Sequence, residues 1–264
     1  MPATDDHWVA GDAYEAYMGR WSRPLAHAFV GWLRPRSGAV WLEVGCGTGA
    51  LTRAICADGA PASVLACDPS ESFVEHARKT LDDPQVSFVV AGADQPPGAP
   101  GFFDYAVSAL VLNLVPDAPR AVTRLRELLR EGGTLGACVW DYAEGMEFLR
   151  VFWDAAVALD PKAEALDEGR RFPLCRPEAL VALFKGAGLQ AVRVEALAVP
   201  THFRSFDDFW SPFLQGTGPA PAYVTSLGRE HRDGLREALV RRLKPDADGV
   251  IRLNARAWAA RGAR

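Results

Sequence analysis

Three glycines at alternate positions follow a short apolar run early in the chain. They are Gly45, Gly47 and Gly49, between an expected strand at residues 39–44 and an expected helix at residues 48–57. Gly45 permits a sharp turn, and the missing Cβ at the other two lets a ligand approach the backbone closely. A helix that begins at such a loop points its N-terminus at the ligand. The spacing therefore predicts a cofactor-binding loop.

An acidic residue closes the next expected strand, at residues 63–67. Asp68 lies about twenty residues beyond the glycine loop, where its carboxylate can accept hydrogen bonds from ribose hydroxyls. Gly45, Gly47 and Ala50 also satisfy a dinucleotide-binding fingerprint. The loop and Asp68 alone thus fit a nicotinamide dinucleotide as well as other ribose-bearing cofactors.

Longer segments distinguish these cofactors. Residues 42–49, 103–117 and 125–135 together resemble the class I S-adenosylmethionine-dependent methyltransferases, in their first motif, their fourth-strand motif and the Gly-Gly turn before strand five. Glu43 adds to the resemblance, because a dinucleotide-binding strand usually stays apolar at this position. The aromatic and arginine-containing segment at residues 14–24 is similar to small-molecule methyltransferases of the trans-aconitate and ubiquinone-pathway type.

The resemblance implies an S-adenosylmethionine site at the ends of the first four strands. Asp68 would hold the ribose hydroxyls, and Arg20 or Arg23 would pair with the cofactor carboxylate, which a guanidinium binds in bidentate fashion. The alternative for the two arginines is an ordinary solvated helix face. The implied cofactor-binding residues are Arg20, Arg23, Glu43, Gly45, Cys46, Gly47, Asp68, Pro69, Ala93, Asp94, Ser108, Ala109 and Asn113.

The segment after the third expected strand departs from the family pattern. Relatives often carry Gly-Asp-Ala there, whereas this chain has Gly92 where the aspartate is expected. Asp94 stands two residues further on and can serve in its place if the alignment slips. We therefore expect Asp94 as a candidate contact for the adenine.

Methyl transfer needs little catalytic apparatus from the protein. The cofactor carries the reactivity and the chain mainly positions the nucleophile. Candidates for a base or an acceptor contact are Asp141 and Tyr142, directly after strand five, and His202, for which an ordinary loop histidine is the favoured interpretation. A helically spaced aromatic stripe is interpreted as core rather than as a substrate box; it comprises Phe206, Phe209, Trp210 and Phe213. His7 and Trp8 are candidates for a mobile lid.

The order of apolar runs predicts an α/β fold. Apolar strands alternate with helices, which indicates a parallel sheet covered on both faces and, up to residue 140, five βα units. Residues 191–199 and 251–258 alternate with period two and predict half-exposed strands near an antiparallel edge. We expect a Rossmann-like, doubly wound, seven-stranded sheet, mostly parallel with an antiparallel edge strand, plus helical cap insertions.

The same pattern suggests how the chain is divided. We expect a single methyltransferase domain over residues 1–264, with an N-terminal helical lid at 1–36 and a cofactor-binding core at 37–140. The segments 141–176 and 201–249 interrupt the α/β pattern and leave from the carboxyl edge of the sheet, where ligands bind in such folds. They are expected to cap the pocket.

Composition excludes several classes of protein. The net charge of −4 over 264 residues lacks the footprint of a nucleic-acid binder. No apolar run reaches the length of about eighteen residues that suggests a membrane span, and the acidic start is unlike a signal peptide, so a cytoplasmic location is expected. The five cysteines and five histidines show no metal-ligand spacing, and no metal is expected.

Three functions remain open at this point. The leading one is transfer of a methyl group from S-adenosylmethionine to a small-molecule acceptor, at oxygen, nitrogen or carbon. The alternatives are an NAD(P)-dependent oxidoreductase and a non-catalytic S-adenosylmethionine-binding protein, because fold does not decide function. The oligomeric state is open as well.

Overall fold

The computed structural model describes residues 15–215 and 218–264, which divide into two compact units. The sheet unit comprises Ser22–Trp140, Leu174–Leu197 and Ala257–Arg264. The helical unit comprises the described residues up to Trp21, Asp141–Pro173 and Ala198–Arg256. Each unit is described by itself.

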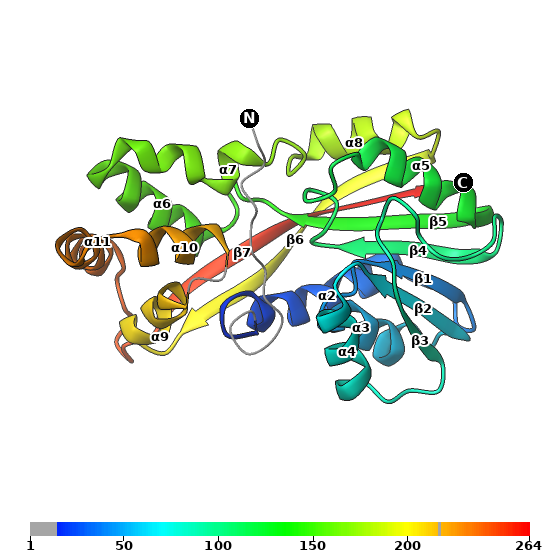
Figure 1. Cartoon of the computed structure of the whole chain (residues 1–264), viewed down its shortest axis with the longest axis horizontal. Coiled ribbons are helices and arrows are strands. Elements are labelled where there is room, and N and C mark those ends of the chain that lie inside the picture. The colour runs from blue at the N-terminus through cyan, green and yellow to red at the C-terminus, as the bar shows by residue number, and fades with distance from the viewer. Residues whose placement is uncertain (1–14, 216–217) are drawn as a thin grey trace. The chain divides into compact units, whose positions relative to one another are not determined.

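A seven-stranded sheet, with the strand order β3-β2-β1-β4-β5-β7-β6, runs through the described residues (Figure 1). The strands are β1 (Val40–Val44), β2 (Ser63–Asp68), β3 (Val86–Val90), β4 (Phe103–Ala109), β5 (Leu129–Trp140), β6 (Gln190–Phe203) and β7 (Ile251–Ala263). Strands β1 to β5 pair in parallel, and β7 pairs antiparallel with β5. The expected fold class, a mostly parallel sheet with an antiparallel strand near one edge, is confirmed.

Helices cover both faces of the sheet, with α2 and α3 on one side and α5 and α8 on the other (Figure 1). The helices are α2 (Arg20–Leu33), α3 (Ala50–Asp58), α4 (Glu71–Thr80), α5 (Ala118–Leu128) and α8 (Pro177–Gly186). Gly136 of β5 faces the side chains of Phe29 and Leu33, and a Cβ there would lie 2.9 Å from a methyl group of Leu33. A glycine in β5 thus lets α2 approach the sheet closely.

The connection between β3 and β4 differs from the expected run of five βα units. Residues 91–102 contain no helix, so β3 leads to β4 through coil and turns. The segment holds three prolines and three glycines within twelve residues, and both residue types disfavour helix interiors. The expectation of a helix in every crossover was therefore wrong at this one.

The helical unit consists of short helices around an aromatic core. Its elements are η1 (Glu15–Gly19), α6 (Glu147–Leu159), η2 (Pro161–Leu166), α7 (Glu168–Arg171), α9 (Phe206–Trp210), η3 (Ser211–Leu214), α10 (Pro219–Ser226) and α11 (Arg229–Arg242). Phe152 and Phe213 stack with ring centroids 4.6 Å apart, and Tyr17 packs edge-on against Phe213. Phe209 and Trp210 are buried with them, which confirms the interpretation as core for these two residues and Phe213, whereas Phe206 is half-buried. No helix among the described residues has the length and apolarity needed to cross a membrane.

A buried carboxylate joins β1 and β4 at their amino ends. Asp104 accepts the backbone N–H of Val40 at 2.8 Å and forms ion pairs with Arg36 and Arg130. Burial alone would raise the pKa of Asp104, but the N–H and the two guanidinium groups outweigh burial, so its pKa lies below the ordinary value. The carboxylate therefore stabilises the start of the sheet in its ionised form.

Replacing Asp104 with alanine should lower the free energy of unfolding by about 1–3 kcal/mol at neutral pH, because a buried N–H loses its acceptor. Since the folded-state pKa is depressed, this contribution is present above the unfolded-state pKa and is lost as the pH falls through the folded-state value. Denaturant unfolding at neutral and acid pH measures both effects. Asp104→Asn is the control, because it keeps an acceptor for Val40 and loses the charge. Unchanged stability of Asp104→Ala at neutral pH would contradict this role.

Candidate cofactor site

The loop between β1 and α3 depends on glycine at three positions. Gly45, Gly47 and Gly49 have φ angles of 78°, 51° and 85°, in the left-handed region that favours glycine. At Gly45 a Cβ would also lie 2.3 Å from a methyl group of Val111, which follows β4. At Gly47 a Cβ would meet none of the described atoms within 4 Å. The loop therefore presents an open backbone surface at Gly47 to a ligand.

The end of β2 holds this loop through the backbone and one side chain. The N–H groups of Gly45 and Cys46 donate to the carbonyl oxygen of Cys67 at 2.7 and 3.0 Å. The N–H of Gly47 donates to one carboxylate oxygen of Asp68 at 3.0 Å, and the N–H of Ser70 donates to the other at 2.9 Å. Asp68 is 8% exposed. Its orientation is therefore set by two backbone donors beside the loop.

The pKa of Asp68 reflects this environment. Burial raises the pKa of its carboxyl, and the N–H groups of Ser70 and Gly47 lower it less than burial raises it. Each carboxylate oxygen has a second acceptor position beyond the one occupied by an N–H. Asp68 can therefore still accept hydrogen bonds from the hydroxyls of a ribose.

A second carboxyl lies beneath the loop. Glu43 is 1% exposed, and it accepts a hydrogen bond from the hydroxyl of Thr52 on α3 at 2.6 Å. Burial raises the pKa of Glu43 from 4.5 to about 7, although the Thr52 hydroxyl lowers it. This bond links β1 to α3 on either side of the glycine loop. Sequence reasoning missed Thr52; the indication was a buried glutamate that needed a donor on the facing helix.

The end of β4 forms the next part of the site. Ser108 is buried, and its hydroxyl has no hydrogen-bond partner among the described residues, which is a feature of positions that meet a ligand or ordered water. Leu110, just beyond the strand, has a φ of 64°, a strained value for a residue with a side chain. Ala109 and Asn113 are partly exposed there. Val111 was not expected, and its contact with Gly45 makes it part of the loop's support.

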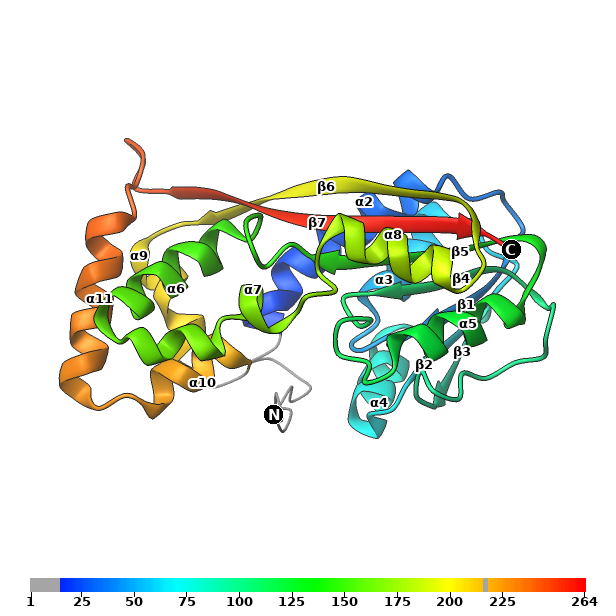
Figure 2. The ribbon, with the colours of Figure 1, turned by 90° about the horizontal axis from the view of Figure 1, so that it is seen from above.

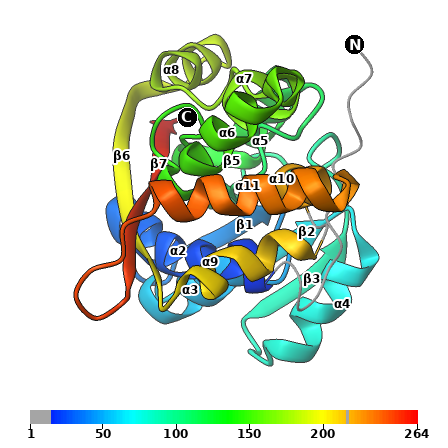
Figure 3. The same cartoon turned by 90° about the vertical axis from the view of Figure 1, so that its left-hand side faces the viewer.

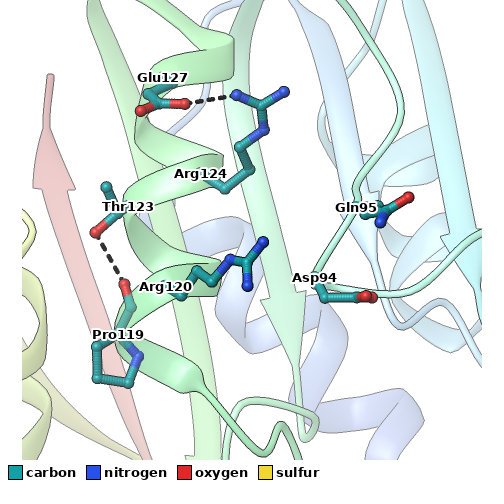
Figure 4. A pocket seen from close by; sticks show the side chains of 7 residues that line it. All are labelled: Asp94, Gln95, Pro119, Arg120, Thr123, Arg124 and Glu127. Atoms are coloured by element: carbon teal, nitrogen blue, oxygen red, sulfur yellow. Dashed lines mark hydrogen bonds and ion pairs between the residues drawn. The ribbon is translucent and has the colours of Figure 1, made fainter.

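The segment after β3 places Asp94 in the space next to Gly92. A Cβ at Gly92 would lie 2.5 Å from a carboxylate oxygen of Asp94, so the Asp94 carboxylate occupies the space that a side chain at position 92 would take. Asp94 and Gln95 line the wall opposite α5 in a groove of about 530 Å³, and their side chains point away from α5 (Figure 4). The α5 wall is lined by Pro119, Arg120, Thr123, Arg124 and Glu127.

Figure 4 shows Arg120 and Arg124 extending from α5 toward the opposite wall of this groove. Arg124 is paired with Glu127 at 2.7 Å, whereas Arg120 has no ion-pair partner among the described residues. The groove therefore has the Arg120 guanidinium on its α5 wall, opposite the segment that carries Asp94 and Gln95.

Comparison with known proteins gives the family of the chain. Residues 42–133 match the family described as methyltransferase domain. The chain is 30% identical over 220 residues to trans-aconitate 2-methyltransferase of Methylobacterium radiotolerans. The matched region covers 79% of this chain and 80% of that protein. The chain belongs to the class I S-adenosylmethionine-dependent methyltransferases. The family's cofactor is S-adenosylmethionine, so the alternative of a nicotinamide cofactor is dropped.

Other similarities of this methyltransferase differ in extent. The solved structure of Haemonchus contortus phosphoethanolamine N-methyltransferase 2, in complex with phosphomonomethylethanolamine and S-adenosylhomocysteine, has a TM-score of 0.59 at 19% identity. The superposed region covers 96% of this chain and 56% of the chain in that structure. A highly reducing polyketide synthase of Neocamarosporium betae is 31% identical over 62% of this chain, which spans only 6% of that protein. The structural likeness shows the fold.

The features of the site fit the family's cofactor. The backbone at Gly47 is open, the Asp68 carboxylate is held in place beside it, and the buried Ser108 hydroxyl is unpartnered among the described residues. Glu43, Gly45, Cys46, Gly47 and Asp68 are brought together by hydrogen bonds or adjacency around one turn. Pro69 is exposed beside them, and Ala93 is partly exposed beside Asp94.

The two N-terminal arginines lie in different units. Arg20 belongs to the helical unit, where its guanidinium donates to both carboxylate oxygens of Asp208 at 3.0 and 3.3 Å and to the backbone oxygen of His202 at 3.1 Å. It also stacks over the ring of Trp21 at 4.5 Å. Arg23 belongs to the sheet unit and is exposed. A cofactor contact from either arginine stays a prediction, and Arg20 would have to exchange Asp208 for it.

The candidates for a base are placed in the helical unit. Asp141 is buried, accepts hydrogen bonds from the Arg256 side chain at 2.7 Å and from the N–H of Glu144 at 3.2 Å, and so holds a turn after β5. Tyr142 is buried against Phe172. His202 is exposed. A catalytic role for any of the three stays a prediction, and His7 and Trp8 lie outside the described residues.

Gly45→Ala should destabilise the protein more than Gly38→Ala. Both glycines have a left-handed φ, 78° and 72°, but a Cβ at Gly38 meets none of the described atoms within 4 Å. Gly38→Ala should therefore show the backbone cost alone, about 1–2 kcal/mol, and Gly45→Ala should add about 1–3 kcal/mol of overpacking against Val111.

The double variant Gly45→Ala/Val111→Ala tests the cause. Compared with Val111→Ala alone, the glycine substitution should then cost less than it does beside Val111, as measured by denaturant unfolding. The two methyl groups at 2.3 and 2.8 Å are gone, and only the Cβ of residue 111 at 3.0 Å remains. Equal costs at both glycines in the unaltered background would show that Val111 does not constrain the loop.

Glu43→Gln should change how stability depends on pH. Because the folded-state pKa of about 7 exceeds the ordinary value of 4.5, the stability linked to protonated Glu43 is complete below the lower value and is lost as the pH rises toward 7. Glutamine lacks this titration and keeps an acceptor for Thr52. The variant's free energy of unfolding, relative to the unaltered chain, should therefore rise by about 3 kcal/mol across this window. The exposed Glu71→Gln is the control, and parallel pH profiles for Glu43→Gln and the unaltered chain would refute the assignment.

Proposed function

We propose that the chain transfers the methyl group of S-adenosylmethionine to a small-molecule acceptor and releases S-adenosylhomocysteine. The observation that carries the proposal is the glycine turn hydrogen-bonded to Asp68, in a chain of this family. A small acceptor is supported by the relative named for trans-aconitate, which the chain matches over most of its length, and by the relative named nocamycin O-methyltransferase of Saccharothrix syringae.

Particular residues would hold the cofactor. Gly45, Cys46 and Gly47 would face its methionine portion, and the Asp68 carboxylate would accept the ribose hydroxyls. The remaining residues of the proposed site would border the ribose and the adenine; these are Pro69, Ala93, Asp94, Ser108, Ala109 and Asn113. The placement of the Asp94 carboxylate over Gly92 supports its use in place of an aspartate at position 92.

The chemistry asks the chain mainly for positioning. The bound cofactor supplies a methyl group on a positively charged sulfur, which a nucleophile displaces in line. The chain would fix the acceptor atom along that line and exclude water, which together account for much of the rate of such reactions. Of the candidate bases, Asp141 is already paired with Arg256, so its carboxylate would have to leave that pair before it could accept a proton.

Titration of the chain with S-adenosylhomocysteine by calorimetry tests the cofactor site. The unaltered chain should bind one equivalent, and Asp68→Ala should weaken binding by about 1.5–3 kcal/mol, the value of a hydrogen bond to a charged group. Asp82→Ala is the matched control, because Asp82 is exposed and lies outside the site. If the folded chain did not bind, the proposal would fail at the cofactor.

A second measurement separates a methyltransferase from a non-catalytic binding protein. Formation of S-adenosylhomocysteine should be followed with panels of small carboxylic acids, phenols and amines. Turnover with one of these classes, lost in Asp68→Ala and retained in Asp82→Ala, is the expected result. Tight cofactor binding without turnover on any panel would favour the non-catalytic alternative.

A further inference from the structure

Strand β6 forms a margin of the sheet, where it pairs with β7 alone among the described strands. Figures 2 and 3 show β6 running along β7 at this margin. A Cβ at Gly262 of β7 would lie 3.3 Å from a methyl group of Val192, so the two strands are closely paired on their inner side. The other side of β6 presents backbone N–H and C=O groups, which are a template for pairing with a further strand.

The side chains of this edge carry a particular charge pattern. Arg193 and Glu195 are both exposed, and they project from the same face of the strand because they are two residues apart. Val192 and Val194 project from the opposite face and are half-buried. Neither Arg193 nor Glu195 has an ion-pair partner among the described residues. An unpaired cation and an unpaired anion thus flank Val194 symmetrically.

We propose that residues 192–196 of β6 pair antiparallel with the same residues of a second copy of the chain, about a twofold axis at Val194. This register places Arg193 opposite Glu195 of the second copy and Glu195 opposite Arg193 of the second copy. Two cross-strand ion pairs form, and opposite charges at directly opposed positions stabilise a strand pair. The interface is isologous, as in the commonest homodimers.

The charges select this register over its neighbours. In a continuous sheet, opposed residues point to the same face, so the twofold axis can move only to another residue position. An axis at Arg193 would set Arg193 opposite its own copy, and an axis at Glu195 would set Glu195 opposite its own copy. Like charges at opposed positions are destabilising. The register centred on Val194 is the one that these two residues favour.

Backbone features limit the segment that can pair. Gly188 and Pro200 lie six positions before and after Val194. Proline has no N–H to donate to a ladder, and glycine weakens strand structure. The stretch between them contains neither residue type. Ala191 has a φ of 49°, in the left-handed region, so regular strand pairing begins after it. Residues 192–196 are therefore the part centred on Val194 that can pair, and the inference does not depend on methyl transfer.

Sedimentation equilibrium of the full chain over a wide concentration range tests the proposal. The unaltered chain should form a dimer in a concentration-dependent manner. Arg193→Glu and Glu195→Arg should each weaken dimerisation by about tenfold or more, because each sets like charges opposite one another twice. The double variant Arg193→Glu/Glu195→Arg should recover the dimer, because it exchanges the two charges and restores both pairs.

Arg241→Glu is the matched control, since it reverses an exposed charge on α11 and should leave dimerisation unchanged. Far-ultraviolet circular dichroism and S-adenosylhomocysteine binding report whether each variant is folded. The proposal is overturned if the unaltered chain is monomeric at every concentration. It is equally overturned if the single reversals leave the dimer intact, or if the folded double variant stays monomeric.

Discussion

The hydrogen bond from the Gly47 N–H to the Asp68 carboxylate is the contact on which the candidate site depends. It joins the turn after β1 to the end of β2, and it requires a left-handed backbone at Gly47. The turn cannot relax toward an ordinary loop without leaving a buried carboxylate with one donor fewer. The same contact aims Asp68 at the space beside the loop. Backbone conformation and ligand chemistry are therefore set together by one glycine and one aspartate.

Burying carboxyl groups costs free energy because they lose their hydrogen bonds to water, and the surrounding residues offset this cost with donors of their own. Glu43 and Asp68 are both buried carboxyls with raised pKa values, and each is supplied with donors by the chain: the Thr52 hydroxyl for Glu43, and the N–H groups of Gly47 and Ser70 for Asp68. Leaving such groups without donors would cost several times what these bonds contribute.

The parts of the site that could be predicted from sequence are those determined locally. Glycines at alternate positions indicate a turn with a left-handed backbone, and an acidic residue at a strand end indicates a ligand contact beside it. The strands β1 to β5 follow from apolar runs. Thr52, Val111 and the position of Asp94 over Gly92 depend on which segments meet in space, which a single sequence does not encode locally. The coil at residues 91–102 was readable from its prolines and glycines, but the regular alternation of strands and helices suggested otherwise. Arg20 is a similar case, because its partner Asp208 lies far along the chain.

The sheet order also has a consequence at its other margin. Because the C-terminal strand β7 inserts between β5 and β6, β6 is left with one described neighbour and a long exposed edge. Proteins usually protect such an edge from indiscriminate pairing with charges or proline. Here Pro200 interrupts the donors of β6, while Arg193 and Glu195 disfavour the two registers that set like charges opposite one another and favour the one centred on Val194. A pair of opposite charges two residues apart thus does more than protect the edge, because it also favours one self-complementary arrangement of two copies.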